Sequence, residues 1–211
     1  SRWFESKSSL FPRGVGRDFA GVITEVGEGV NRFAVGDKVF GTMISDPGLR
    51  TKRGALATEV CVNESEIVLK PEMIDMNHAA TMGVASLTVG GAFRKIELNS
   101  KDVVVISAAA GGIGSIAVQY AVAKGATVIG IASKKNSDYL KSLGAIPVAY
   151  EENIQNALLS ASTKPITKFL DCYGGDYVKL AFHLGLNGTD IGTLVPSPFV
   201  MIKGAQFTGP R

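Results

Sequence analysis

The chain has 211 residues, of which 45% are hydrophobic, and its formal net charge is only +3. This composition is typical of a globular protein with one large or two modest domains. The basic residues are scattered, so no basic stripe with interleaved aromatic residues predicts nucleic-acid binding. No apolar run reaches the roughly 18 residues that a membrane span needs. The first residues lack a secretion signal, and Cys61 and Cys172 stand too far apart to indicate a disulfide framework. A reducing, cytoplasmic compartment is therefore expected, although a cleaved organelle signal would leave no trace.

Short β patterns broken by glycine occupy the first third of the chain. Strands are predicted over 21–27, 35–41 and 54–62, and 67–71 closes the unit. Glycines at this spacing are typical of a small, tightly turned barrel or curled sheet.

From about residue 74 the pattern alternates between helix and strand. Helices are predicted over 76–96, 136–143, 152–162 and 176–184, and strands over 103–106, 126–132, 147–150, 168–172, 189–195 and 202–207. Such alternation predicts an α/β domain whose parallel sheet carries helices on both faces. The expected domains are residues 1–73 and residues 74–211.

The most informative motif follows the apolar run 103–106. Small residues and glycines come next, and then apolar residues recur at helical spacing from Ile113 to Ala121. A strand, a glycine turn and a helix in this order form the context of a dinucleotide fingerprint, here A-x-G-G-x-G. The backbone of the turn and the helix N-terminus would hold a pyrophosphate. The residues expected to do so are Ala109, Ala110, Gly111, Gly112, Ile113 and Gly114.

The end of the next strand indicates which coenzyme binds. An NAD site usually has Asp or Glu there, to accept hydrogen bonds from the ribose hydroxyls, and this carboxylate would repel a 2′-phosphate. Here Ser133, Lys134 and Lys135 follow the strand, and the first acid is Asp138, expected inside the next helix. The alternative is an ordinary solvated turn. The pattern favours NADP(H) over NAD(H).

Several separate segments together resemble the medium-chain dehydrogenase/reductase superfamily. They are GRDFAGVI at 16–23, VGEGV at 26–30, FAVGDKV at 33–39, LKSLGA at 140–145 and DCYGG at 171–175. Within the superfamily the chain is similar to the zinc-independent, quinone-oxidoreductase-like branch. The resemblance implies part of a GroES-like β-barrel, then a Rossmann doubly wound sheet, with the active site in the cleft between them. Members are usually much longer, so the chain is expected to be a fragment.

The resemblance adds further coenzyme residues. Tyr150 matches a tyrosine that touches the 2′-phosphate, with a strand-end core tyrosine as the alternative. Thr88 corresponds to a threonine near the nicotinamide amide, with helix packing as its alternative. Cys172 and Leu194 lie at the ends of the fourth and fifth strands and would line the crevice. Cys172 is interpreted as a small apolar filler rather than a reactive thiol.

No metal site is expected. Zinc-dependent relatives have histidine where this chain has Arg17, which is permanently protonated and cannot bind zinc. Their later cysteine ligand would fall near 81–85, where this chain has none, and His78 and His183 are interpreted as structural. The catalytic residues stay unassigned. Arg17 is a candidate proton donor, but an ion pair with Asp18 or a neighbour is the favoured interpretation.

Without a metal, a readily reduced acceptor is favoured over a simple alcohol. The expected function is NADPH-dependent hydride transfer to a quinone or an α,β-unsaturated carbonyl compound. One alternative is an enoyl-thioester reductase of fatty-acid or polyketide type, and another is a non-enzymatic structural or sensor protein that binds NADPH. The resemblance also implies a possible homodimer through the edge strand near 202–207.

Overall fold

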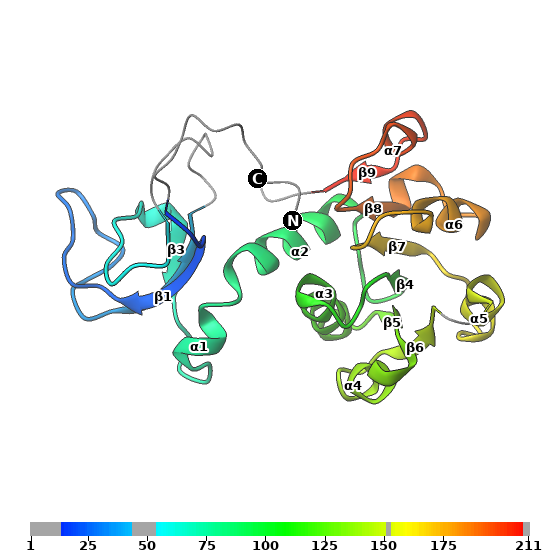
Figure 1. Ribbon diagram of the computed structural model, residues 1–211, viewed down its shortest axis with the longest axis horizontal. Coiled ribbons are helices and arrows are strands. Elements are labelled where there is room, and N and C mark those ends of the chain that lie inside the picture. The colour runs from blue at the N-terminus through cyan, green and yellow to red at the C-terminus, as the bar shows by residue number, and fades with distance from the viewer. Residues whose placement is uncertain (1–13, 44–53, 151–152, 209–211) are drawn as a thin grey trace. The chain divides into compact units, whose positions relative to one another are not determined.

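The computed structural model describes residues 14–43, 54–150 and 153–208 (Figure 1). The chain divides into two compact units, and the division falls between Val84 and Ala85.

The first unit is built on a small antiparallel sheet in the order β1-β2-β3. Its strands are β1 (Asp18–Val22), β2 (Lys38–Thr42) and β3 (Ile67–Leu69), and a short 3-10 turn, η2 (Glu64–Glu66), precedes β3. A small core of Phe33, Val39 and Ile67 holds the unit together. These three strands agree with the expected small β domain, but they are shorter than predicted. β1 also begins three residues before the predicted strand 21–27 and overlaps it only at Gly21 and Val22.

The segment 54–62 is not a strand, so that prediction was wrong. Ala55 N–H donates to Gly16 O at 3.1 Å and Leu56 N–H donates to Val15 O at 2.8 Å, but these hydrogen bonds do not continue as a strand ladder. Leu56 is 82% exposed and no residue of the segment is fully buried, although Val62 at its end packs against the small core. A period of two specifies a strand only where one face packs on a core.

The second unit contains a six-stranded sheet in the order β6-β5-β4-β7-β8-β9, and every neighbouring pair is parallel. Its strands are β4 (Val103–Ile106), β5 (Thr127–Ala132), β6 (Ile146–Ala149), β7 (Lys168–Asp171), β8 (Ile191–Thr193) and β9 (Gln206–Phe207). Its helices are α2 (Gly83–Lys95, which begins in the first unit), α3 (Gly112–Ala123), α4 (Ser137–Ser142), α5 (Ile154–Ser160), α6 (Tyr177–His183) and α7 (Pro198–Ile202), with 3-10 turns η3 (Lys134–Asn136) and η4 (Gly188–Asp190).

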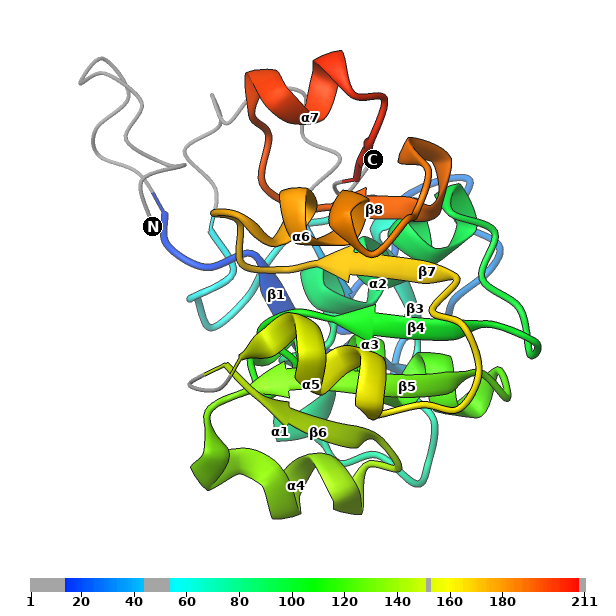
Figure 2. The ribbon, with the colours of Figure 1, turned by 90° about the vertical axis from the view of Figure 1, so that its right-hand side faces the viewer.

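Helices cover both faces of this sheet. Figure 2 shows α5 and α6 in front of the strands and α3 behind them. The core accordingly has two parts: one packs α2, α3 and α4 against the sheet, and the other packs α5, α6 and α7 against the opposite face. The central strand β4 is at most 1% exposed along its whole length. Burial on both faces explains why its sequence is an unbroken apolar run rather than an alternating one.

Two predicted elements differ in detail. The helix expected over 76–96 is interrupted, so that α1 (Met76–Ala79) ends before α2 begins at Gly83. The side chain of Asp18, on β1, accepts a hydrogen bond from the Val84 N–H at 2.9 Å and so caps α2. The strand expected over 202–207 is confined to β9, because Ser197 caps the preceding α7, which has proline at its first position.

The strand order determines where a ligand can bind. The chain runs outward from β4 to β5 and β6, then returns to the other side of β4 to form β7, β8 and β9. This is the doubly wound order, and it reverses direction between β4 and β7. The helices that follow these two strands lie on opposite faces, which leaves a crevice at the carboxyl ends of the strands. The expected fold class is confirmed.

Candidate functional site

The turn between β4 and α3 is held tightly by backbone hydrogen bonds. Ala109 N–H donates to Ile131 O, and Gly111 N–H donates to Ala108 O, both at 2.9 Å. Helix α3 starts at Gly112, and its first hydrogen bond runs from Ser115 N–H to Gly111 O at 2.8 Å. The N–H groups of residues 112–114 therefore have no partner within the helix, and the glycine N-cap has no side chain to occupy them. Such a helix end attracts an anion.

The glycines of this turn have different physical roles. A Cβ on Gly114 would lie 2.1 Å from Ala108 O, so the helix can pack this closely on the turn only with glycine. A Cβ on Gly112 would meet no atom within 4 Å, so this position faces open space. Ala109 replaces the first glycine of the strictest fingerprint, and it is fully buried. Its methyl group fits because β5 carries Gly130 opposite it, where a Cβ would lie only 3.0 Å away.

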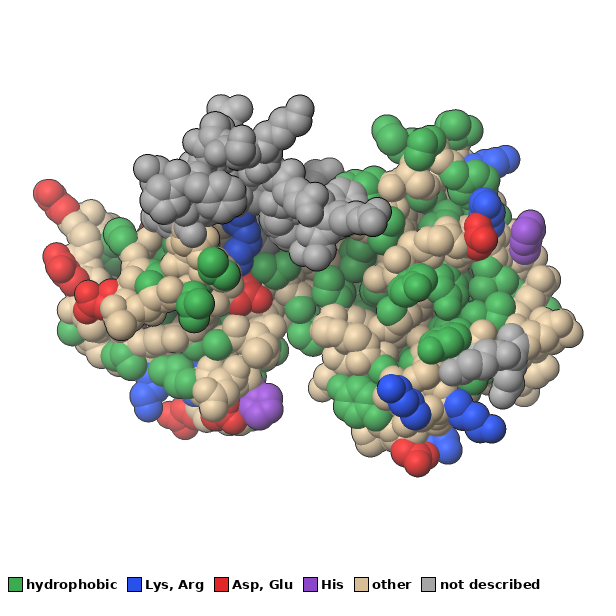
Figure 3. Space-filling view, viewed as in Figure 1, with side chains coloured by type: hydrophobic (Ala, Val, Ile, Leu, Met, Phe, Trp, Pro, Cys, Tyr) green, Lys and Arg blue, Asp and Glu red, His purple; other side chains and the backbone are tan. Residues whose placement is uncertain are grey.

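A basic turn follows β5. Ser133 precedes η3, which contains both Lys134 and Lys135, and the Asn136 amide donates to Ser133 Oγ at 3.1 Å. Both lysines are exposed, and neither forms an ion pair within the described residues. Asp138 lies in α4, as expected, and pairs with Lys141 at 3.5 Å. Figure 3 shows basic side chains gathered on the part of the second unit that carries α4.

A pocket of about 490 Å³ lies beside the glycine turn. It is lined by Ala108, Ala110, Gly111, Ile131, Ala132, Ser133, Asn136, Tyr150, Tyr173 and Tyr177. The structure thus brings four of the predicted residues into one pocket: Ala110, Gly111, Ser133 and Tyr150. Tyr150 follows β6 and is 54% exposed, so it is not a core residue. Other predicted residues lie around the pocket in the same turns rather than in its lining; they are Ala109, Gly112, Ile113, Gly114, Lys134 and Lys135.

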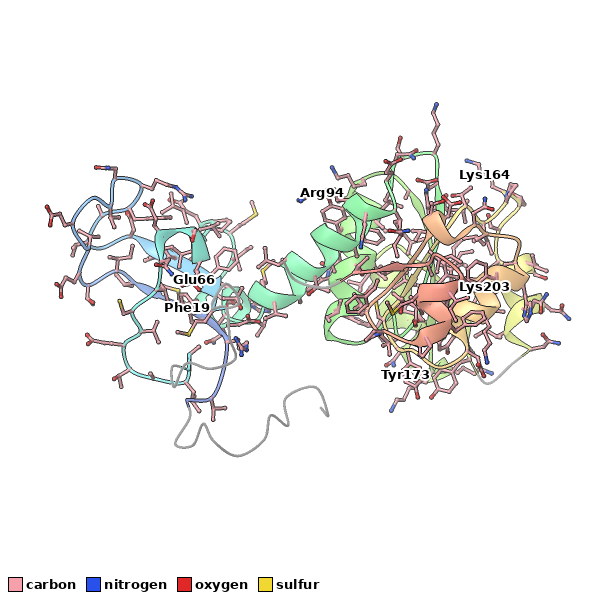
Figure 4. The ribbon with its side chains drawn as sticks, turned by 90° about the horizontal axis from the view of Figure 1, so that it is seen from above. Phe19, Glu66, Arg94, Lys164, Tyr173 and Lys203 are labelled. Carbon is pink, nitrogen blue, oxygen red and sulfur yellow. The ribbon has the colours of Figure 1, made fainter. Side chains whose placement is uncertain are left out.

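Two aromatic residues of this pocket were not predicted from the sequence. Tyr173 follows β7 and Tyr177 opens α6, and their rings meet edge to face with centroids 5.8 Å apart. Tyr173 is 70% exposed and lies at the surface of the second unit (Figure 4). Burial, and then the charge of Asp171, raises the pKa of Tyr177, so its hydroxyl stays protonated at neutral pH. The only signal in the sequence was the position of both tyrosines just after a strand end.

A buried polar group next to Tyr173 was not predicted from the sequence either. Asp171 ends β7 and is fully buried. Its Oδ1 accepts hydrogen bonds from Ser107 Oγ at 2.7 Å, Tyr173 N–H at 3.0 Å and Gly174 N–H at 2.9 Å. Its Oδ2 accepts from Thr193 Oγ1 at 2.9 Å and from Gly174 N–H at 3.2 Å. The carboxylate therefore joins the ends of β4, β7 and β8 without a cation among these partners.

Cys172 and Leu194 are both half-buried at the carboxyl edge of the sheet. Leu194 N–H donates to the backbone oxygen of Asp171 at 2.9 Å, and Cys172 packs against the core on the α3 side. Burial, and to a smaller extent the charge of Asp171, raises the pKa of the Cys172 thiol to about 12. The thiol is thus protonated at neutral pH, which agrees with an apolar filler rather than a nucleophile.

Thr88 lies on α2, where it is 3% exposed. Its buried Oγ1 has no hydrogen-bond partner among the described residues, which is unusual for a buried hydroxyl. The open end of α3, the glycine turn and the pocket beside them are features that accommodate a dinucleotide. The described residues therefore fit such a coenzyme.

In the first unit, Arg17 Nη1 donates to Met43 O at 2.9 Å, while Asp18 caps α2. His78 is exposed and pairs with Asp75 at 2.7 Å, and His183, also exposed, ends α6. Within residues 14–43, 54–150 and 153–208, no three His, Cys, Asp or Glu side chains are grouped so that they could hold a metal ion. In the same residues, no helix has the length and apolar character to cross a bilayer.

Comparisons with known proteins agree with this architecture. The family model of the alcohol dehydrogenase GroES-like domain matches residues 3–72, and that of the zinc-binding dehydrogenase matches residues 112–191. A solved quinone oxidoreductase from Coxiella burnetii superposes with a TM-score of 0.74 at 34% identity, over 92% of this chain and 62% of that chain.

Curated relatives give the same result. The chain is 32% identical to a mitochondrial NAD(P)H oxidoreductase of Bos taurus, over 92% of this chain and 50% of the relative. It is 33% identical to a chloroplastic quinone-oxidoreductase homologue of Spinacia oleracea, over 72% of this chain and 46% of the relative. The chain belongs to the medium-chain dehydrogenase/reductase superfamily and, within it, to the quinone-oxidoreductase-like branch. It spans about half the length of these curated relatives.

Proposed function

We propose that this chain binds NADPH and belongs to an enzyme that transfers hydride from it to a quinone or an α,β-unsaturated carbonyl compound. The observation that carries the proposal is the turn after β5. Ser133, Lys134 and Lys135 stand there, and the nearest following acid, Asp138, lies in α4 and pairs with Lys141. Two exposed ammonium groups and a hydroxyl favour a 2′-phosphate, whereas a carboxylate would favour the ribose hydroxyls of NADH.

Each part of the crevice has a role in this proposal. The turn of residues 109–114 and the open end of α3 hold the pyrophosphate, because its unpaired N–H groups and the helix dipole favour negative charge. Tyr150 adds a phenol donor to the phosphate side of the pocket. Thr88 donates its unpartnered hydroxyl to the nicotinamide amide. Cys172 and Leu194 line the crevice at the ends of β7 and β8.

The nicotinamide supplies the hydride when it is bound, and the protein supplies position and protection from water. Quinones and enones suit this division, since they accept hydride at an electrophilic atom and spread the charge onto oxygen without a metal. Arg17 stands where a zinc-dependent relative has a ligand, and its guanidinium cannot bind a metal ion. We propose no zinc and assign no catalytic acid or base to this chain.

The coenzyme proposal is tested by replacing Lys134 and Lys135 with alanine. A hydrogen bond to a charged group contributes about 1.5–3 kcal/mol, and both side chains are exposed, so we expect the low end, about tenfold weaker NADPH binding per lysine. NADH binding should change little, because NADH has no 2′-phosphate. The matched control replaces Lys101 and Lys203, two exposed lysines of the second unit outside the pocket. Equal losses for both coenzymes would contradict the assignment.

A second candidate is the reduction of 2-enoyl thioesters. A mitochondrial enoyl-[acyl-carrier-protein] reductase of Bos taurus is 30% identical over 88% of this chain and 51% of its own length, which favours this candidate. NADPH oxidation by the longest natural form of the protein should be compared with a quinone, a simple enone and a 2-enoyl thioester. The acceptor with the largest kcat/KM identifies the class. Tight NADPH binding with no turnover on any acceptor would instead support the structural or sensor alternative.

Two further expectations extend the proposal. We propose a cytoplasmic or other reducing compartment; the curated relatives named above are mitochondrial and chloroplastic, and imaging of the tagged natural protein distinguishes these locations. We also propose a homodimer through β9, which is the last strand in the sheet order and carries Phe207, 43% exposed. Light scattering after gel filtration measures the mass, and a Phe207→Lys variant should shift it toward the monomer.

A further inference from the structure

The buried carboxylate of Asp171 controls the backbone of the turn that follows β7. Three consecutive N–H groups point into one polar cluster. Cys172 N–H donates to Ser107 Oγ at 2.9 Å, while the N–H groups of Tyr173 and Gly174 donate to Asp171 itself. The chain then passes through Gly174 and Gly175 with φ of 94° and 66°, a left-handed conformation that glycine permits. The backbone of the turn is therefore held by hydrogen bonds to Asp171 and to Ser107, which itself donates to Asp171.

All of the described groups that bond to the Asp171 carboxylate donate a hydrogen bond to it. Two are hydroxyls, Ser107 Oγ and Thr193 Oγ1, and the others are backbone N–H groups. A carboxylate accepts at both oxygens, whereas an amide at the same position can accept at only one and presents an NH₂ group to the other donors. Asp171→Asn keeps the shape of the side chain, but it replaces a charged acceptor by a neutral one and puts an NH₂ group in place of one oxygen, for instance Oδ2, which accepts from Thr193 Oγ1 and Gly174 N–H. The hydrogen bonds that hold the turn are therefore weakened.

Tyr173, which lies in this turn, is part of the aromatic lining of the pocket. Tyr173 is tied to Asp171 by its backbone N–H, yet its ring is 70% exposed and lines the pocket together with Tyr177. Ser133 and Tyr150 line the same pocket, and they follow β5 and β6, which lie on the other side of β4 from β7 in the strand order. An exposed tyrosine ring across a pocket from a hydroxyl and a phenol offers a flat apolar face on one side and hydrogen-bond donors on the other. This combination matches a purine nucleoside that carries a phosphate.

We infer that Asp171 is a positioning residue for the coenzyme, acting through Tyr173, whose ring stacks against the adenine of the bound dinucleotide. The inference rests on the proposed NADPH binding and adds to it a residue that never touches the ligand. The carboxylate sets the backbone at Tyr173, and the ring then meets the base at low entropic cost, because the turn is already ordered.

The same sheet contains a matched control. Asp102 is also buried, 7% exposed, and its oxygens accept from Asn99 N–H and Thr167 Oγ1, both at 2.8 Å. It precedes β4 and therefore lies at the amino edge of the sheet, whereas Asp171 lies at the carboxyl edge. Asp102→Asn and Asp171→Asn both disturb a buried carboxylate bonded to threonine and backbone, but only one of these carboxylates supports the pocket.

The experiment measures binding of adenosine 2′,5′-bisphosphate by calorimetry and thermal unfolding of the same samples. The 211-residue chain is compared with Asp171→Asn, Asp102→Asn, Tyr173→Ala and the double variant Asp171→Asn/Tyr173→Ala. We expect Tyr173→Ala to weaken binding about tenfold, as the loss of one base–aromatic stack does. Asp171→Asn should weaken it to a similar extent, and the double variant should bind no worse than the weaker single variant. Asp102→Asn should lower the Tm while leaving the affinity within about twofold of wild type.

The outcomes separate the two proposals. If the wild-type chain binds neither this ligand nor NADPH, the proposed function itself is wrong. If wild type binds and Asp171→Asn binds equally well, or if the losses in the double variant add, Asp171 does not act through Tyr173 and the inference is overturned. Should Asp171→Asn fail to fold, Ser107→Ala removes one donor of the cluster, and its non-additivity with Tyr173→Ala decides the question in the same way.

Discussion

Replacing Gly114 with alanine should destabilise the second unit by forcing α3 away from the glycine turn. The new Cβ would lie 2.1 Å from Ala108 O, 2.8 Å from Ala109 Cα and 2.9 Å from Ala108 C. All three are backbone atoms, so no side chain can rotate to make room. The helix must shift, and the shift loosens the fully buried contacts of Ala117 and Ala121 with the sheet.

The size of the effect follows from two opposing contributions. Overpacking of a core typically costs about 1–3 kcal/mol, and a clash this close with backbone places Gly114→Ala near the upper end. Alanine in place of glycine within a helix returns about 0.5–1 kcal/mol. The net loss in the free energy of unfolding is therefore about 2–2.5 kcal/mol. At roughly 3–5 °C per kcal/mol for a unit of this size, the Tm should fall by about 6–12 °C.

Gly112→Ala is the matched control, because its Cβ meets no atom within 4 Å. Its stability should stay within about 0.5 kcal/mol of wild type, while NADPH binding should weaken, since the methyl group occupies the surface that the pyrophosphate approaches. Urea unfolding followed by circular dichroism gives the stabilities, and fluorescence titration gives the affinities. A Gly114→Ala chain as stable as wild type, or a Gly112→Ala chain as unstable as Gly114→Ala, would refute the described packing of α3.

Two further predictions concern single contacts. Cys172 should resist maleimide between pH 7 and 9 in the folded chain and react on unfolding, because its thiol pKa is about 12 in the fold against an ordinary 9.0. The protonated thiol therefore contributes to the stability of the fold. This contribution is complete below the ordinary pKa and is lost as the pH rises from 9 to 12. Asp171→Asn should lower this thiol pKa in an absorbance titration at 240 nm, and an unchanged value would show that burial alone sets it. Asp18→Ala should lower the free energy of unfolding by about 0.5–2 kcal/mol, since Asp18 caps α2 through Val84 N–H. Asp18→Asn keeps the acceptor and should retain most of the stability of the wild-type chain. A melting curve of Asp18→Ala identical to that of wild type would show that the cap contributes nothing.

The parts of the fold that were predicted correctly are those specified by local patterns. The apolar run of β4, the glycine turn and the start of α3 lie within a dozen residues, and their order leaves one structural solution. The strand predicted over 54–62 was wrong because its local pattern does not correspond to a buried face. Its residues alternate, but Leu56 is 82% exposed and no residue of the segment is fully buried; Val62 at its end packs against the small core. The prediction of an uninterrupted helix over 76–96 was wrong because α2 begins anew at Gly83, where Asp18, distant in sequence, caps it through Val84 N–H.

The residues of the candidate coenzyme site fall into the same two groups, those that a local pattern predicts and those that it does not. Ser133, Lys134 and Lys135 could be named from the sequence as a candidate phosphate-binding turn, because they follow directly after a recognisable strand and differ in charge from the residues of an NAD site; their role stays a prediction. Tyr173 gave no such signal, since an aromatic residue after a strand is as common in a core as in a pocket. Its exposure and its place opposite Tyr150 depend on the order of the strands, which brings the ends of β6 and β7 to the same edge of the sheet.

By itself the sequence determined a parallel α/β unit with a dinucleotide turn and a basic residue pair, because hydrophobic period, glycine and charge act over short stretches of chain. Only the tertiary structure decided which distant groups meet. Ser107 and Asp171 are 64 positions apart and Thr193 lies 22 beyond, yet their side chains share one buried cluster. Gly130 accommodates the methyl group of Ala109 from a different strand. Such contacts depend on strand order and packing, which no local pattern encodes.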